Sequence, residues 1–181
     1  MTNDTDMRDM ECIEPFTVAP WQSRADVRIQ GRETAIEMAK KAIPELTIFT
    51  DASDKNGVVG IGVTHLARYG TTCISKTVRN SGTVSVHTAE LMAIKEACRL
   101  VNGLWPGHGI YRGLTVTIYS DSQSALQALA KPRQQSGQSH LREITNLVTS
   151  LKERWAPRLI FRWVPGHSGV RGNEQAHQAA R

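Results

Sequence analysis

The sequence is poor in cysteine. Its three cysteines (Cys12, Cys73 and Cys98) are odd in number and far apart, so they match neither a disulfide framework nor a zinc site. No apolar run approaches the roughly 20 residues needed to cross a membrane, and the acidic, polar start does not resemble a secretory signal. We therefore expect an intracellular protein of the nucleus or cytoplasm, in a reducing compartment and with no membrane partner.

The sequence also lacks any block of five or more Lys and Arg residues that would mark a nuclear signal or a basic tail. Its net charge of +5 is uneven, because residues 1–44 carry eight acidic and six basic side chains, whereas residues 45–181 carry nine and sixteen. The basic part suits a polyanionic partner, and an ordinary solvated surface explains it equally well. We interpret residues 1–44 as an N-terminal extension, disordered over 1–16 with one helix over 32–43, and residues 45–181 as the main domain.

Two stretches of the chain are near copies of each other. Thr47–Asp51 and Thr117–Asp121 both read Thr, Ile, an aromatic residue, a hydroxyl residue and Asp. Their β-branched and aromatic residues predict two buried strands. Parallel neighbours would bring both carboxylates to the carboxyl edge of the sheet, where a divalent cation would relieve their repulsion. Alternatively, each Asp caps a helix, which suits Asp121 but not Asp51, because a turn is expected over 52–57.

The remaining patterns predict an α/β fold built on a five-stranded mixed sheet with helices on both faces. Alternating apolar residues predict an antiparallel meander of three strands, followed by two parallel strands, over 46–51, 58–66, 72–78, 114–121 and 158–164. Helical spacing predicts helices from Thr88, taken as an N-cap, and over 122–130, 138–155 and 172–181. Gly60 and Gly62 within the second strand suggest that another backbone approaches closely there.

Four motifs then occur in one order: Thr50-Asp51-Ala52-Ser53, Thr88-Ala89-Glu90-Leu91-Met92-Ala93, Ser120-Asp121-Ser122-Gln123 and the stretch from Trp163 to Glu174. In order and spacing they resemble the type 1 ribonuclease H family over about residues 45–181, which implies an RNase H-like fold for that domain. The residues within these motifs further resemble the RNase H domains of fungal non-LTR retrotransposons. Residues 19–21 and 35–42 resemble the linker that follows the reverse transcriptase there. We accordingly expect an upstream reverse transcriptase in a polyprotein as a partner, and a monomeric domain.

The resemblance implies an endonuclease that cleaves the RNA strand of RNA/DNA hybrids with two divalent metal ions, Mg²⁺ or Mn²⁺. One metal orients the attacking water and the other stabilises the leaving oxygen, and such hard ions take oxygen ligands. By the resemblance, Asp51 binds both metals, whereas Glu90 and Asp121 hold the metal at the leaving group. The alternative role for Glu90 is to favour the helix dipole from the first turn of its helix.

Further residues match the substrate side of the family. His167 matches a mobile histidine that serves proton transfer or product release, although a lone histidine in a glycine-rich loop is otherwise a surface residue. Gln123 matches a reader of the hybrid's minor groove, whose 2′-hydroxyls distinguish RNA from DNA. Two other groove-reading positions, usually Asn, are Val86 and His87 here, which weakens the expected binding. The basic handle of some bacterial members is absent, so phosphate contacts are expected from Lys131, Arg133, Arg142, Arg158 and Arg162.

The main departure from the family is His177. The pattern Gly-Asn-Glu-x-x-Asp predicts an Asp at this position, where it would bind the metal that activates water. We expect His177 to be a ligand of that metal, on the last helix with its ring facing Asp51, and imidazole suits Mn²⁺ better than Mg²⁺. An active ribonuclease H, a weakened domain that binds hybrid or duplex but cuts poorly, and a structural polyprotein domain all remain open. The presence of Asp51, Glu90, Asp121 and His167 favours the first.

Overall fold

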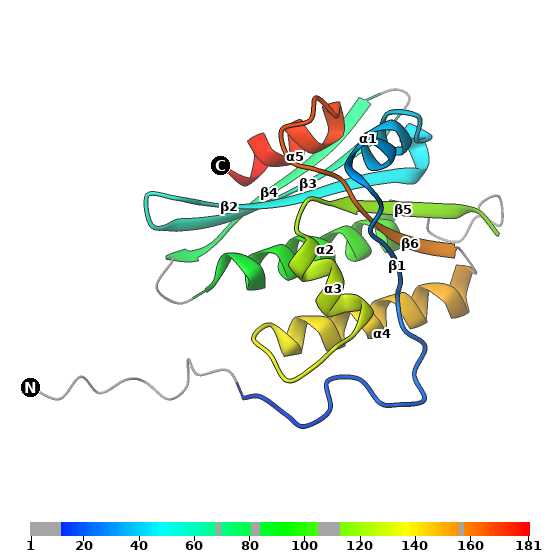
Figure 1. Cartoon of the computed structure of the whole chain (residues 1–181), viewed down its shortest axis with the longest axis vertical. Coiled ribbons are helices and arrows are strands. Elements are labelled where there is room, and N and C mark those ends of the chain that lie inside the picture. The colour runs from blue at the N-terminus through cyan, green and yellow to red at the C-terminus, as the bar shows by residue number, and fades with distance from the viewer. Residues whose placement is uncertain (1–11, 68–69, 81–83, 105–112, 156–157) are drawn as a thin grey trace, which may run out of the picture.

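The structure is a computed structural model that describes residues 12–67, 70–80, 84–104, 113–155 and 158–181. The strands of one mixed sheet lie in the order β1-β6-β5-β2-β3-β4 (Figure 1). In chain order the elements are β1 (Asp26–Arg28), α1 (Arg32–Lys40), the 3₁₀ turn η2 (Pro44–Leu46), β2 (Thr47–Lys55), β3 (Val58–Ala67), β4 (Gly70–Asn80), α2 (Val86–Leu104), β5 (Thr115–Ser120), α3 (Gln123–Ala130), α4 (Gln138–Trp155), β6 (Arg158–Trp163) and α5 (Arg171–Ala180).

The sheet contains six strands rather than the predicted five. The antiparallel meander β2-β3-β4 and the parallel pairs of β2 with β5 and β5 with β6 are as predicted. The additional strand is β1, which comes from the N-terminal extension and runs parallel to β6, with Asp26 opposite Ile160 and Arg28 opposite Arg162. A strand of three residues is too short to show an alternating pattern, so the sequence did not reveal it.

Strand β2 is longer than predicted. We expected it to end at Asp51 and to be followed by a turn over 52–57, but it continues to Lys55. Only Asn56 and Gly57 turn the chain into β3, and both have positive φ angles of 54° and 80°, as a two-residue hairpin of type I′ requires. Pairing with β5 nevertheless stops at Thr50 opposite Ser120. Asp51 and Asp121 therefore both follow the last parallel pair.

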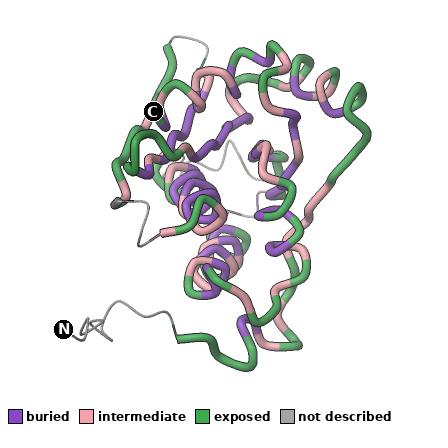
Figure 2. Tube along the Cα trace, turned by 60° about the vertical axis from the view of Figure 1, so that its left-hand side comes forward, coloured by how far each residue is buried: buried purple, intermediate pink, exposed green. Residues whose placement is uncertain are grey.

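Alternate residues of the central strands face two different helical layers. Ile48 and Ile118 belong to a core shared with buried residues of α2, α3 and α4. Phe49 and Tyr119 point the other way, stack at 5.1 Å between ring centroids, and join a second core with residues of α1 and α5. The expected arrangement of helices on both faces is visible in Figure 1, and Figure 2 shows the buried residues gathered between the layers.

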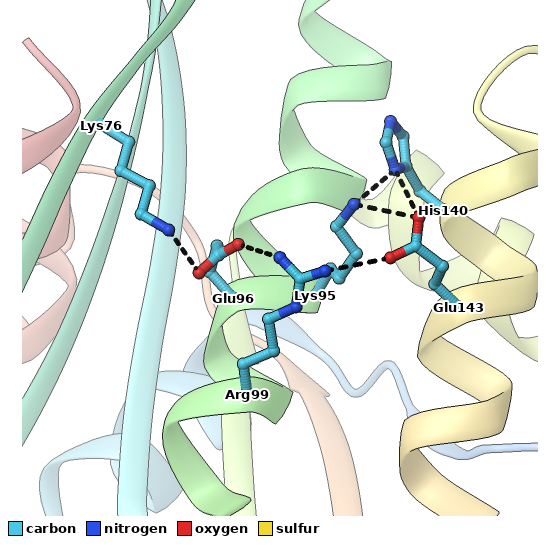
Figure 3. Close-up of polar contacts among 6 residues, drawn as sticks. All are labelled: Lys76, Lys95, Glu96, Arg99, His140 and Glu143. Atoms are coloured by element: carbon cyan, nitrogen blue, oxygen red, sulfur yellow. Dashed lines mark hydrogen bonds and ion pairs between the residues drawn. The ribbon is translucent and has the colours of Figure 1, made fainter. Parts of the chain in front are cut away.

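Helix α2, which carries Glu90, is tied to its neighbours by a chain of ion pairs (Figure 3). Glu96 of α2 accepts hydrogen bonds from Lys76 of β4 at 2.7 Å and from Arg99 at 2.6 Å. Glu143 of α4 accepts from Arg99 at 3.2 Å and from the buried Lys95 at 3.3 Å. The chain thus connects β4, α2 and α4, and holds α2 in place over the sheet.

Helix α2 starts three residues earlier than predicted. The helix begins at Val86, and the hydroxyl of Ser85 accepts the backbone N–H of Thr88 at 3.1 Å. Ser85 is therefore the capping residue, and our assignment of Thr88 was wrong. Because of this shift, Glu90 lies beyond the first turn, where the charge of a helix dipole is concentrated. Its predicted alternative role at the helix terminus is therefore not supported.

Two glycines of β3 allow α5 to lie directly on the sheet, as their pattern suggested. A Cβ atom on Gly60 would lie 2.3 Å from the carbonyl oxygen of Ala180, and one on Gly62 would lie 2.0 Å from that of Ala176. Both distances are shorter than any real contact, so any larger side chain would force α5 away. This contact brings His177, which lies between these two alanines on α5, close to β2.

Candidate active site

Three carboxylates meet at the predicted edge of the sheet. Asp51, Glu90 and Asp121 each offer an oxygen, and these oxygens lie within 4.8 Å of one another. Asp51 and Glu90 are only 3% and 6% exposed. Glu90 reaches β2 from α2, and its Oε1 accepts the backbone N–H of Ala52 at 3.3 Å. The near-identical strand sequences thus place their acids side by side, as we expected.

The surroundings of Asp121 leave its carboxylate available to this cluster. Helix α3 is capped by Ser122, whose hydroxyl accepts the N–H of Ala125 at 3.3 Å, so the alternative that Asp121 caps this helix is wrong. Trp163 donates from Nε1 to the backbone carbonyl of Asp121 at 3.0 Å and fixes the chain there. A Cβ on Gly166 would come within 2.9 Å of Asp121 Oδ2, so this glycine leaves room for the carboxylate.

The cluster carries more negative charge than the protein compensates. Burial, followed by the charges of Asp121 and Asp51, raises the pKa of Glu90 well above its ordinary value. Burial and the carboxylate of Asp51 raise the pKa of Asp121 to about 6, against the opposing effects of His177 and a hydrogen bond from Asn173. Glu90 Oε2 is buried and has no hydrogen-bond partner among the described residues. These oxygens therefore fit a hard divalent metal ion, which would supply both the missing charge and the missing partner.

His177 lies where we expected it, on α5 with its ring against Asp51. Its Nδ1 is 2.6 Å from Asp51 Oδ2, and 22% of its side chain is exposed. Nε2 is buried and makes no hydrogen bond within the described part of the chain. Since His177 contacts a carboxylate and is not part of the group of three acids, its role as a metal ligand stays a prediction.

The other predicted residues surround the carboxylates without joining them. His167 lies in the loop before α5 with a φ of 51° and a side chain that is 74% exposed. Its ring stands edge-on to that of His177, with 4.9 Å between centroids. Gln123 is the first residue of α3 and is exposed. Both side chains are therefore accessible to a large ligand that covers the carboxylates.

One residue near the site was missed by sequence reasoning. Asn173 is 2% exposed and hydrogen-bonds to Asp121, which lowers the pKa of that carboxyl against the larger effect of burial. It belongs to the Gly-Asn-Glu motif at the start of α5. That motif is the signal in the sequence that points to Asn173 as well as to His177.

Most residues expected to contact phosphates are engaged elsewhere. Arg142 pairs with Glu14, Arg158 with Asp26 at 3.0 Å, and Arg162 donates to Gln30 at 2.8 Å. All three partners belong to the N-terminal extension. Lys131 and Arg133, by contrast, are exposed and line a cavity. The extension therefore changes which of the basic side chains can bind an anion.

The fold and the carboxylates define a mixed α/β domain with a candidate metal site at the carboxyl edge of its central strands. The RNase H family model matches residues 44–181, so the chain belongs to the RNase H family. No curated protein sequence shows significant similarity to it. None of the described helices is long and apolar enough to cross a membrane.

Solved structures share this fold at low sequence identity. RNase H1 from the halophilic archaeon Halobacterium salinarum NRC-1 is 15% identical, with a TM-score of 0.51 over 74% of this chain and 95% of that one. LC11-RNase H1, isolated from compost by a metagenomic approach, is 18% identical, with a TM-score of 0.55 over 76% and 96%. The same enzyme in complex with an RNA/DNA hybrid is 20% identical, with a TM-score of 0.53 over 74% and 95%. At these identities the likeness concerns the fold.

Proposed function

We propose that this domain cleaves the RNA strand of RNA/DNA hybrids by metal-dependent hydrolysis. The observation that carries the proposal is the convergence of Asp51, Glu90 and Asp121, within a chain of the RNase H family, into a cluster with uncompensated negative charge. The hybrid bound to LC11-RNase H1, which shares the fold, supports the same class of substrate.

The three carboxylates would hold two divalent ions, with Asp51 shared between them. When bound, such ions make a water nucleophilic at neutral pH and neutralise charge on the leaving oxygen. The protein prepares the carboxylates: the N–H of Ala52 holds one oxygen of Glu90, Asn173 holds Asp121, and His177 holds Asp51. This leaves Oε2 of Glu90 as a buried oxygen without a protein partner in the described chain.

The exposed side chains around the cluster would act on the substrate. We assign proton transfer to the leaving 3′-oxygen, or assistance to product release, to His167, because imidazole is the commonest side chain in general acid–base catalysis and this side chain is accessible. We assign recognition of the minor groove to Gln123, which follows Asp121 by two residues. A monomeric state, an intracellular location, an upstream reverse transcriptase and the domain boundary at residue 45 stay predictions.

A cleavage assay on a labelled RNA/DNA hybrid, with Mg²⁺ and with Mn²⁺, tests the proposal. The RNA strand should be cut to products with 5′-phosphate and 3′-hydroxyl ends, and duplex DNA should stay intact. Affinity for the hybrid should fall as salt rises, because phosphate contacts release counterions. Comparable cutting of duplex DNA would indicate a different nuclease with this fold.

A second candidate function is binding of hybrid or duplex with little cleavage. The observation that favours it is His177, which stands where the family has a carboxylate and contacts Asp51. Tight binding of the hybrid without cleavage in either metal would establish this function and overturn the first. Cleavage that disappears in Asp51→Asn would exclude it.

A further inference from the structure

A cavity of about 600 Å³ lies between the N-terminal extension, α3 and the residues that follow α3. Val27 and Ile29 of the extension and Ala128 of α3 provide apolar surface, whereas Lys131, Arg133 and Gln135 provide polar groups. None of the three clustered carboxylates lines it. It is therefore a separate binding space that the proposed chemistry does not use.

The extension is a fixed wall of this cavity because it is fastened at two points. Gln138 of α4, which is 1% exposed, donates to the carbonyl of Glu14 at 2.7 Å and accepts the N–H of Glu14 at 2.7 Å. Thr17 donates to the carbonyl of Arg133 at 2.9 Å. Further along, β1 pairs with β6 through its backbone. Backbone pairing with β6 thus holds Val27, and the next residues along the chain up to Ile29, at the wall of the cavity, and Val27 also packs against the main core.

The charge of the cavity favours an anionic ligand. Lys131 and Arg133 are exposed, and neither forms an ion pair with any residue that the structure describes. No Asp or Glu is among the described residues that line the space. Gln135 Nε2 is buried and lacks a hydrogen-bond partner within the described ranges, so a donor is also available. Two cations, one donor and an apolar surface match the phosphate, the acceptor atoms and the face of a nucleotide.

The cavity lies beside the path of a nucleic acid that covers the carboxylates. His87, three residues before Glu90, and Ser124, three residues after Asp121, both line it, with His87 Nδ1 3.2 Å from Ser124 Oγ. From Ser124 to Lys131 the chain advances seven residues, or roughly 10 Å at the rise of an α-helix. The space therefore begins about one helical turn from the carboxylates and extends away from them.

We propose that this cavity binds one unpaired nucleotide, with its base against Val27 and Ile29 and its phosphate at Lys131 and Arg133. This inference rests on the proposed function for the nature of the substrate. A base inside a duplex is stacked and paired, so a nucleotide outside the paired segment enters a pocket at a lower cost, without unstacking or unpairing. A single-stranded overhang flanking the hybrid and a free mononucleotide both offer this chemistry.

Binding to hybrids with and without overhangs tests the inference on the full chain. Affinities are measured with metal chelated, on blunt hybrids and on hybrids with a short overhang at either end of either strand. We expect wild type to bind one class of overhang on the order of tenfold more tightly than the blunt hybrid. Ile29→Asp and Lys131→Glu should each abolish this gain, since one places a charge on the apolar surface and the other reverses the charge at the phosphate.

Two matched variants control for general effects of these substitutions. Ile43→Asp changes another exposed isoleucine of the extension, and Lys152→Glu changes an exposed lysine of α4; neither residue lines the cavity. Both should keep the gain in affinity. Titration with adenosine 5′-monophosphate separates the two sources of ligand. Saturable binding that Lys131→Glu removes would assign the cavity to a free mononucleotide. A gain in affinity from overhangs, without binding of the mononucleotide, would assign it to a nucleic-acid strand.

Two results would overturn the inference. One is that the protein neither prefers overhangs nor binds adenosine 5′-monophosphate saturably. The other is that the gain in affinity from overhangs persists in both Ile29→Asp and Lys131→Glu. Cleavage of the blunt hybrid, measured in parallel with metal present, keeps these results separate from the proposed function. If the protein cuts blunt hybrid but shows no preference for overhangs, the cavity assignment fails and the proposed function remains. Overhang preference without cleavage would argue against the proposed function and leave the cavity assigned.

Discussion

His177 Nδ1 lies 2.6 Å from Oδ2 of Asp51, the carboxylate expected to bind both metals. The contact exists because Gly60 and Gly62 let α5 rest on β3, which brings the histidine across to β2. At this position the family pattern has an Asp. The histidine of this chain instead donates a hydrogen bond to Asp51 and adds no negative charge. A metal ion at this position would be held by coordination to an imidazole nitrogen and not by the negative charge of a carboxylate.

Replacing His177 with aspartate should raise the cleavage rate in Mg²⁺. The ratio of the rate in Mn²⁺ to the rate in Mg²⁺ should therefore fall, by roughly tenfold or more. The reason is that Mg²⁺ prefers oxygen ligands, whereas Mn²⁺ tolerates nitrogen better. Initial rates measured against metal concentration would show the change, with His177→Ala as the control that removes the ring without adding an acid. An unchanged metal preference in both variants would mean that His177 is not a ligand.

The part of the fold that the sequence predicts well is the part with local, periodic signals. The two near-identical strand sequences located Asp51 and Asp121, and the Gly-Asn-Glu motif located His177. The second half of β2 was read as a turn because Ser53, Asp54 and Lys55 are polar, although pairing with β3 holds them in a strand. Strand pairing is a long-range contact that local propensity does not contain.

The role of the extension was not predictable for a related reason. Strand β1 is only three residues long and is held by its backbone. Its docking determines that Arg158 pairs with Asp26 and that Arg162 donates to Gln30, partners that lie 132 residues apart in each case. Such pairs leave no spacing pattern in a single sequence, so all five basic candidates looked equally able to bind phosphate.

Replacing Asp51 with asparagine should abolish cleavage, by about a thousandfold or more, while the fold persists. If Asp51 binds both metals as expected, its loss should remove several kcal/mol of the transition-state stabilisation that the metals would provide. In the metal-free protein the same change relieves repulsion with Asp121 and Glu90, so the melting temperature should hold or rise. Rates and thermal unfolding in a chelator would be measured together. Retained turnover would remove Asp51 from the mechanism.

Replacing Gly62 with alanine should destabilise the protein by about 1–3 kcal/mol, as overpacking of a close contact does. The new Cβ would lie 2.0 Å from the carbonyl of Ala176, so α5 must move away from β3. Gly70→Ala is the matched control, because a Cβ on this glycine of β4 meets nothing within 4 Å. Urea unfolding of both variants would test the contact. Equal stability of both would show that α5 yields without cost.

The last prediction concerns stability and pH in the metal-free protein. Burial and the neighbouring Asp51 raise the pKa of Asp121 from 3.8 to about 6. Between these values the folded state keeps a proton that the unfolded chain has released. The unfolded state thus binds fewer protons in this window, so the free energy of unfolding falls as pH rises from about 4 to about 6.

Asp121→Asn removes this titration, so its stability advantage over wild type should grow across the same pH window and then level off. The shift of roughly two units corresponds to about 3 kcal/mol. Thermal unfolding in a chelator over this range would measure the advantage, with Asp54→Asn, at an exposed acid of the same strand as Asp51, as the control. Adding Mg²⁺ should raise the stability of wild type and not of Asp121→Asn, because only wild type retains all three carboxylates. A difference between Asp121→Asn and wild type that stays constant with pH would show that the proton at Asp121 does not contribute to folding.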